Sequence, residues 1–145
     1  MNISQEFEWI LRLLLALFLG YFIGLERQMR GQAAGERTHA LVALGSALFV
    51  LVSLNAFTGE GTSRVASNIV TGLGFLGAGM IIKEQHEIHG LTTAAGIWAV
   101  GGVGMCIGLG EYGMGTLAAF LIWLLLISER ILRLDDRLKK FRSKN

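Results

Sequence analysis

Five apolar segments, separated by short polar stretches, constrain the fold of this chain more than any other feature. Their ranges are about 9–25, 40–57, 65–82, 91–109 and 112–127. Each is near the length that a helix needs to cross a hydrocarbon core roughly 30 Å thick, and each is too continuously apolar for a barrel strand. Only 17% of the 145 residues are charged, whereas a soluble domain carries about 25%. We predict an all-α, polytopic membrane protein with one domain of five transmembrane helices, residues 1–128.

The basic residues between the segments predict the orientation in the membrane. Ranges 26–39, 83–90 and 128–145 carry three, one and seven Lys or Arg residues, eleven in all, and would lie on one side. The other side has only Arg12, which we expect to snorkel to the headgroups, and Arg64. Because Lys and Arg accumulate in cytoplasmic loops, we expect the N-terminus outside and the C-terminus in the cytoplasm.

We predict that the tail, residues 129–145, forms a cytoplasmic amphipathic helix rich in basic residues. One helical face of it is apolar and carries Ile131, Leu134, Leu138 and Phe141. Such a helix would lie on the anionic inner leaflet, and a partner-binding helix is the alternative. We expect no cleaved signal peptide, because Glu6 and Glu8 precede a first segment that has no basic start.

A glycine-rich stretch in the third segment, "TGLGFLGAG", has the spacing G-x-G-x-x-G. In a dinucleotide-binding fold this spacing follows a strand and precedes a helix in water, but here apolar residues flank it on both sides. We therefore expect neither a dinucleotide nor a nucleic acid as a ligand. In lipid, small residues four apart let helices approach closely, as at Gly20 and Gly24 or Gly104 and Gly108. We expect the third segment's glycines to lie at the most crowded helix crossing or at a homodimer seam, namely Gly72, Gly74, Gly77 and Gly79.

Polar residues where helices meet the cytoplasmic face are the first candidate site. Glu26 and Arg27 follow the first segment, and Arg37 and Thr38 open the second. Ordinary anchoring at the interface is the alternative interpretation, and it is the one we favour for Arg30 and Glu36. We predict that Glu26, Arg27 and Arg37 form a charge cluster, and that Arg37→Ala abolishes function. We expect Thr38 to cap the second helix, and Thr92 and Thr93 to cap the fourth near the cluster. The free N–H groups at the start of the fourth helix could equally attract an anion or a carboxylate from a neighbour.

Other polar residues offer weaker candidates for a site. Asn68 and Thr71 lie within the third segment, where hydrogen bonds between helices or a polar pathway for an ion would satisfy them. His86 and His89 lie in a polar loop, whose flexibility argues against a metal site. The single cysteine, Cys106, lies in an apolar stretch, and we expect it to be a small buried thiol.

Four blocks together resemble the MgtC/SapB family of bacterial inner-membrane proteins. They are "LLLALFLGYFIGLERQMRG", "AGERTHALVALGSALFVLVS", "SRVASNIVTGLGFLGAGMI" and "HGLTTAAGIWAVGGVGM", and the resemblance covers about residues 11–110. Members often have an apolar residue at Glu36, a basic one at His89, Gln at Asn68 and sometimes Asn at Thr92. Many members add a soluble cytoplasmic domain after the fifth span, so we expect a short form without it.

The resemblance implies a link to low magnesium, acid stress and the survival of pathogens inside host cells, and a place in the inner membrane. It leaves two functions open. One is a regulator of other membrane proteins, with ATP synthase membrane subunits as a partner. The other is a transporter or channel for Mg²⁺ or another ion. Magnesium favours carboxylates, and only Glu26 comes near the interior of a span, which argues against a dedicated pathway. We expect no enzymatic activity and no bound cofactor, with Mg²⁺ as the one ion that could act as a ligand.

Overall fold

Five helices and one short hairpin make up the structure, a computed structural model that describes residues 3–57, 60–85 and 87–142. For residues 60 and 129–142 it describes the backbone alone. The helices are α1 (Ile3–Met29), α2 (Glu36–Ala56), α3 (Glu60–Ala78), α4 (Leu91–Leu109) and α5 (Tyr112–Arg142). The strands are β1 (Ile82–Glu84) and β2 (Glu87–His89).

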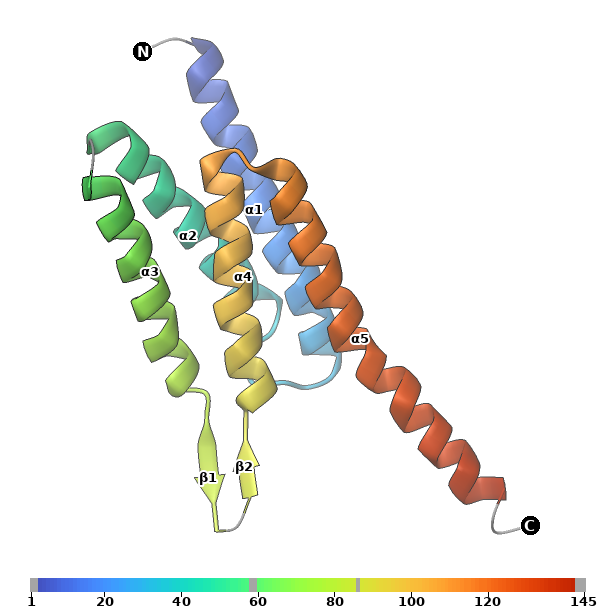
Figure 1. Ribbon diagram of the computed structural model, residues 1–145. Helices are drawn as coiled ribbons and strands as arrows, with labels where there is room; N and C mark the ends of the chain where they lie inside the picture. The colour runs from blue at the N-terminus through green and yellow to red at the C-terminus, as the bar shows by residue number, and fades with distance from the viewer. Residues whose placement is uncertain (1–2, 58–59, 86, 143–145) are drawn as a thin grey trace.

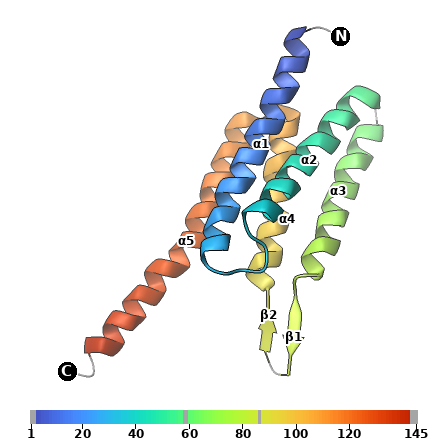
Figure 2. The same cartoon turned by 180° about the vertical axis from the view of Figure 1, so that it is seen from behind.

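The helices alternate in direction and pack side by side (Figures 1 and 2). α1, α3 and α5 run toward the end from which β1 and β2 project, and α2 and α4 run away from it. We call this the hairpin end and the other the N-terminal end, because the chain begins there. The strands pair antiparallel, with Ile82 opposite His89 and Glu84 opposite Glu87.

The lengths and hydropathies of the helices confirm an all-α membrane protein. Three helices, α1, α2 and α4, are long and apolar enough to cross a membrane. α3 has 19 residues with a polar first half, and the apolar part of α5, Tyr112–Ser128, is shorter than a full span.

Two expected boundaries were wrong. α3 ends at Ala78 rather than near residue 82, and the expected loop 83–90 is largely the β-hairpin. The tail after residue 128 is no separate helix, because α5 continues without a break to Arg142 and projects past the bundle in Figure 1.

α2 packs tightly against α1 and α4 because glycines on these two helices let it approach closely. A Cβ atom added to Gly20 of α1 would lie 2.8 Å from Cβ of Ala43. One added to Gly104 of α4 would lie 2.2 Å from the Ala43 carbonyl oxygen. Gly24 and Gly108 extend the same two contacts toward opposite ends of α2. The small-residue faces of α1 and α4 thus form the tightest crossings within the chain.

The glycines of α3 do not lie at such a crossing. Added Cβ atoms on Gly72 and Gly74 would meet nothing within 4 Å. One on Gly79, which directly follows α3, would meet only carbonyl oxygens of the last turn of α3. A Cβ atom added to Gly77 would lie 3.4 Å from the Ala94 carbonyl oxygen of α4, an ordinary contact distance. Within this chain the expectation of a crowded crossing on α3 is therefore wrong. α3 packs on α4 mainly through Leu73, whose side chain covers Gly101.

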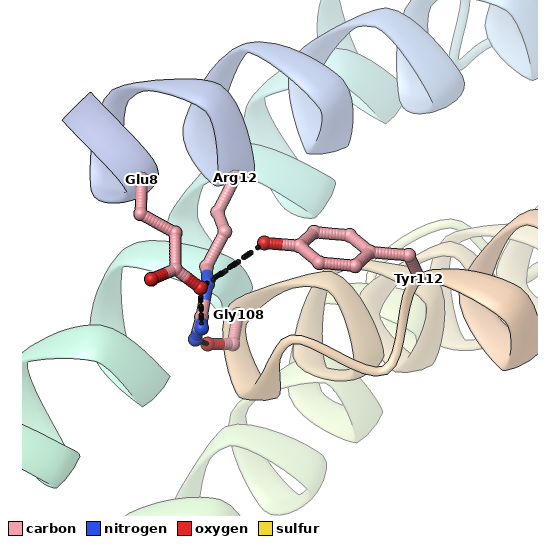
Figure 3. Close-up of polar contacts among 4 residues, drawn as sticks. All are labelled: Glu8, Arg12, Gly108 and Tyr112. Carbon is pink, nitrogen blue, oxygen red and sulfur yellow. Dashed lines mark hydrogen bonds and ion pairs between the residues drawn. The ribbon is translucent and has the colours of Figure 1, made fainter. Parts of the chain in front are cut away.

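At the N-terminal end, Arg12 of α1 binds the turn between α4 and α5 (Figure 3). Its Nη1 donates to the Gly108 carbonyl at 2.8 Å, and its Nε donates to the Tyr112 hydroxyl at 3.2 Å. Its third nitrogen forms an ion pair with Glu8, one turn earlier on α1. Arg12 therefore satisfies one of the last carbonyls of α4, which has no partner within its own helix.

Candidate functional site

A group of buried charged side chains lies at the hairpin end, where α1 ends. Glu26 and Arg27 are only 5% and 2% exposed, and charges so deeply buried need partners. One Glu26 oxygen lies 3.5 Å from Nη1 of Arg27, and the other pairs with Arg30, one helical turn later. A single carboxylate thus lies between two guanidinium groups. We call Glu26, Arg27 and Arg30 the charge cluster.

A buried histidine of α2 lies beside this cluster. His39 is fully buried, and its Nδ1 lies 2.9 Å from the Gly35 carbonyl oxygen. Because a carbonyl can only accept, Nδ1 carries the proton and Nε2 presents a lone pair. Nε2 has no hydrogen-bond partner in the part of the chain that the structure describes. It is directed at α4, since a Cβ on Gly96 would lie 3.6 Å from it.

Thr93 connects the start of α4 to the loop between α1 and α2. Its hydroxyl donates to Oε1 of Gln32 at 3.2 Å, and the Gln32 N–H donates to the Arg27 carbonyl at 3.1 Å. Thr93 is 2% exposed, and Gln32 connects it to the backbone of Arg27, a member of the charge cluster. Three chain segments, from α1, the following loop and α4, are joined at this point.

The predicted capping roles were wrong. Gly35 and Gly90 occupy the N-cap positions of α2 and α4, and neither helix has a side-chain cap. Thr92 is exposed, Thr38 is half-buried, and Thr93 bonds to Gln32 instead.

Arg37 is not part of the charge cluster. It is exposed, and it forms no ion pair within residues 3–57, 60–85 and 87–142. Arg30, which was expected to be an interfacial anchor, pairs with Glu26 instead, because it directly follows the last turn of α1, four residues after Glu26. The sequence predicted that Glu26 and Arg27 would lie together, but it could not distinguish Arg30 from Arg37 as the third member.

A groove of about 620 Å³ separates α2 from α3. It is mainly apolar, but Thr38 and Ser46 of α2 and Asn68 of α3 also line it. Gly45 and Gly72 face each other's helix across it, and added Cβ atoms there would meet nothing within 4 Å. Asn68 is exposed at this groove. Thr71 is satisfied within its own helix, where its hydroxyl donates to the Ser67 carbonyl at 3.0 Å.

The described residues of the hairpin form no recognisable metal site. His89 lies 3.4 Å from a Glu87 oxygen, and both side chains are largely exposed. His86 lies outside the described residues. Within the described chain, no three His, Cys, Asp or Glu side chains are grouped so as to hold a metal ion.

Three residues of this site were not assigned to it from the sequence, namely His39, Gln32 and Arg30. His39 stands in the quoted motif "ERTHAL", and a histidine in the first turn of an apolar helix is a costly residue that signals a role. Gln32 and Arg30 give no such signal, because polar loop residues are common. Their contacts depend on how the loop folds back against α4, which periodicity does not reveal.

Comparison with known proteins gives the family. A sequence profile of the MgtC family matches residues 13–134. The chain is 46% identical over 127 residues to the "Putative magnesium transporter YhiD" of Escherichia coli K12, covering 82% of this chain and 59% of that protein. It is 46% identical over 116 residues to Protein MgtC of Salmonella typhimurium, covering 80% and 50%. An uncharacterised protein of Synechocystis is 42% identical over 118 residues, covering 79% and 50%.

No solved structure matches the chain. The chain spans between one half and three fifths of the length of these relatives. The family profile, by contrast, covers most of this chain and includes the charge cluster, His39 and Thr93. The chain therefore belongs to the MgtC family.

Proposed function

We propose that this protein regulates other membrane proteins when magnesium is scarce or the medium is acidic, and that it is neither an ion carrier nor an enzyme. The membrane subunits of ATP synthase are the partner that the family resemblance implies. The proposed setting is the bacterial inner membrane, with the hairpin end in the cytoplasm, as the distribution of Lys and Arg favours.

The observation that carries this proposal is the state of the Glu26 carboxylate. Magnesium sites in proteins use one or two free carboxylates together with retained waters. Glu26 is the most deeply buried acid among the described residues, and it is already shared between Arg27 and Arg30. Two guanidinium groups on one carboxylate would repel a divalent cation, which argues against a magnesium pathway at this end.

The groove between α2 and α3 supports binding to another membrane protein. Ser46 and Asn68 face it with polar groups that lipid chains cannot hydrogen-bond, and Gly45 and Gly72 leave room for a backbone to approach. We therefore propose that the groove takes a transmembrane helix of the partner, with a hydrogen-bonding side chain at the depth of Asn68.

Magnesium transport is the second candidate, and the name of the E. coli relative favours it. The two candidates differ in a simple measurement. A carrier moves Mg²⁺ when purified and reconstituted alone, whereas a regulator needs its partner. Mg²⁺ flux into proteoliposomes that contain only this protein would therefore overturn the regulatory proposal.

The direct test places a photo-crosslinking amino acid at Leu76, which lines the groove and is 51% exposed. Leu125 of α5, 72% exposed and outside the groove, is the matched control. In magnesium-starved cells we expect crosslinks to an ATP synthase membrane subunit from position 76 only. Asn68→Leu should reduce them while leaving expression unchanged.

A second copy of this chain is the competing occupant, since we also propose a homodimer. A crosslinked product of twice the mass from position 76, with no other partner, would assign the groove to the dimer. Equal crosslinking from positions 76 and 125 would show that the groove binds no partner in preference to the rest of the exposed surface.

A further inference from the structure

We propose that two copies of this chain pair through α5, in parallel, along one apolar face that continues from the span into the part of α5 past the bundle. We call that part, residues 129–142, the α5 extension. The inference rests on the homodimer proposed above but not on the regulatory function. It places the contact between the two copies on α5, away from the groove between α2 and α3.

The apolar residues of the α5 extension follow a heptad repeat. Ile131 and Leu138 take position a, and Leu134 and Phe141 take position d, at steps of three, four and three residues. Helices with this 3.5-residue repeat pack side by side on one another. Ile at a followed by Leu at d, as at 131 and 134, favours two parallel helices. Among the apolar residues of the extension, only Leu132 lies off this face.

The same repeat continues back into the span, on a face that the bundle leaves uncovered. Ala119 and Leu126, 4% and 5% exposed, pack in the core. Positions a and d fall on the opposite face, where Leu117, Phe120 and Leu124 are 59%, 54% and 47% exposed. Within the span these four positions are Leu117, Phe120, Leu124 and Ile127. We call the a and d positions from 117 to 141 the heptad face.

The path of α5 determines what can cover the heptad face of the extension. α5 has 31 residues, whereas a span needs about 20, so it extends about 15 Å beyond the hydrocarbon core. No break separates the extension from the span, and Figure 1 shows it projecting past the bundle at the hairpin end. A helix on the leaflet surface would have to turn away from the direction of the span. Since α5 does not turn, the apolar face of the extension projects into the medium and needs a protein partner.

A second copy of this chain matches the heptad face in direction and in charge. Two copies inserted with the same orientation have parallel α5 helices, so each a or d position meets its own equivalent. Arg130 takes position g and Asp135 takes position e of the next heptad, two positions that lie beside each other across a parallel pair. Their opposite charges give two attractive pairs by symmetry. Arg137 and Arg142 form the next g and e pair with like charges, so the attraction is confined to the start of the extension.

The span supplies what the extension lacks for pairing. Isolated helices shorter than about 12–15 residues are marginal in water, and the extension is no longer than that. Here it continues a helix that the membrane has already formed, so no new helix has to be nucleated. The membrane also holds two copies side by side, which raises their effective concentration. Pairing at the heptad face therefore does not require a long coiled coil.

The test compares three neighbouring positions of the extension in the full chain. In a Cys106→Ala background, Leu134→Cys and Leu138→Cys place thiols at positions d and a. Asp136→Cys, two residues from each, places a thiol at position f, on the far side of the helix. Each variant is reconstituted in vesicles of phosphatidylcholine, with or without phosphatidylglycerol, and oxidised with copper phenanthroline. The disulfide-linked dimer is then measured on non-reducing gels.

We expect dimers from positions 134 and 138 in both kinds of vesicle. Position 136 should give at least about tenfold less, because a disulfide needs Cα atoms within about 7 Å. Asp135→Arg places two arginines at the g and e contact and should lower the yield from position 134 several-fold. Adding Arg130→Asp restores opposite charges and should restore the yield. Recovery by this exchange would not follow if Asp135→Arg only impaired folding.

Three results would overturn the proposal. Equal yields from positions 134, 136 and 138 would show random collision of the helices. Yields that disappear when phosphatidylglycerol is present would show that the extension lies on the anionic leaflet. Absence of dimers from 134 and 138 would exclude pairing through α5. In that case a crosslinked product of twice the mass from position 76 would retain the homodimer and place it at the groove, whereas its absence would contradict the homodimer as well.

Discussion

At the scale of single residues, the burial of Arg27 predicts how the charge cluster fails when it is broken. Arg27→Ala leaves Glu26 buried with one partner instead of two, and breaking a buried pair costs about 3–5 kcal/mol. We expect a large loss of stability in detergent unfolding assays. Arg37→Ala, at an exposed position without an ion pair, should change the unfolding free energy by no more than about 0.5 kcal/mol. Equal losses in the two variants would contradict the assignment of Arg27 rather than Arg37 to the cluster.

Arg12 provides a second prediction at this scale, because it joins α1 to the end of α4. Arg12→Gln removes the donor to the Gly108 carbonyl, and the loss should be on the order of 1 kcal/mol. Glu8→Gln removes only the exposed ion pair and should lower the melting temperature less. If Glu8→Gln is the more damaging variant, the ion pair and not the carbonyl contact holds this end together.

At the scale of the helices, the close approach of α4 to α2 can be tested with two glycines of one helix. Gly104→Ala forces a methyl group against the Ala43 carbonyl oxygen, and overpacking of this kind costs about 1–3 kcal/mol. Gly102→Ala meets nothing within 4 Å and should be neutral or stabilising, because alanine favours a helix. The difference between the unfolding free energies of the two variants measures the cost of an added methyl group where α4 crosses α2. If Gly104→Ala is as stable as Gly102→Ala, the two helices are farther apart than described.

The same helices show what a single sequence can predict. The small-residue spacing at Gly20 and Gly24 indicated a packing face, and the structure uses that face. The richer pattern at Gly72 and Gly74 indicated one equally well, yet within this chain it faces open space. Spacing gives the shape of one helix surface. Which surface meets which neighbour depends on loop length and on pairs of helices, and neither follows from periodicity.

At the scale of the whole molecule, the apolar segments predicted the helical membrane fold, because lipid leaves the backbone few alternatives. The hairpin 82–89 and the continuous α5 were missed, since short strands and helix extensions depend on local contacts. For the site, Glu26 and Arg27 were expected to pair because of their position at the end of an apolar helix, whereas Thr93 was expected as a helix cap and bonds to Gln32 instead. His39 could be seen in the sequence, but no role was predicted for it. Gln32 bonds to Thr93 only because the loop after α1 folds back against α4.

The orientation of the whole molecule yields the last prediction. Eleven Lys and Arg residues on the side of the hairpin end, against two on the other, should retain that end in the cytoplasm. In a Cys106→Ala background, Glu84→Cys and Glu111→Cys place single exposed thiols at the hairpin end and at the N-terminal end. A membrane-impermeant maleimide should label Glu111→Cys in intact spheroplasts and Glu84→Cys only in inverted vesicles. The reverse pattern would place the charge cluster outside the cell and contradict the proposed cytoplasmic position of the hairpin end.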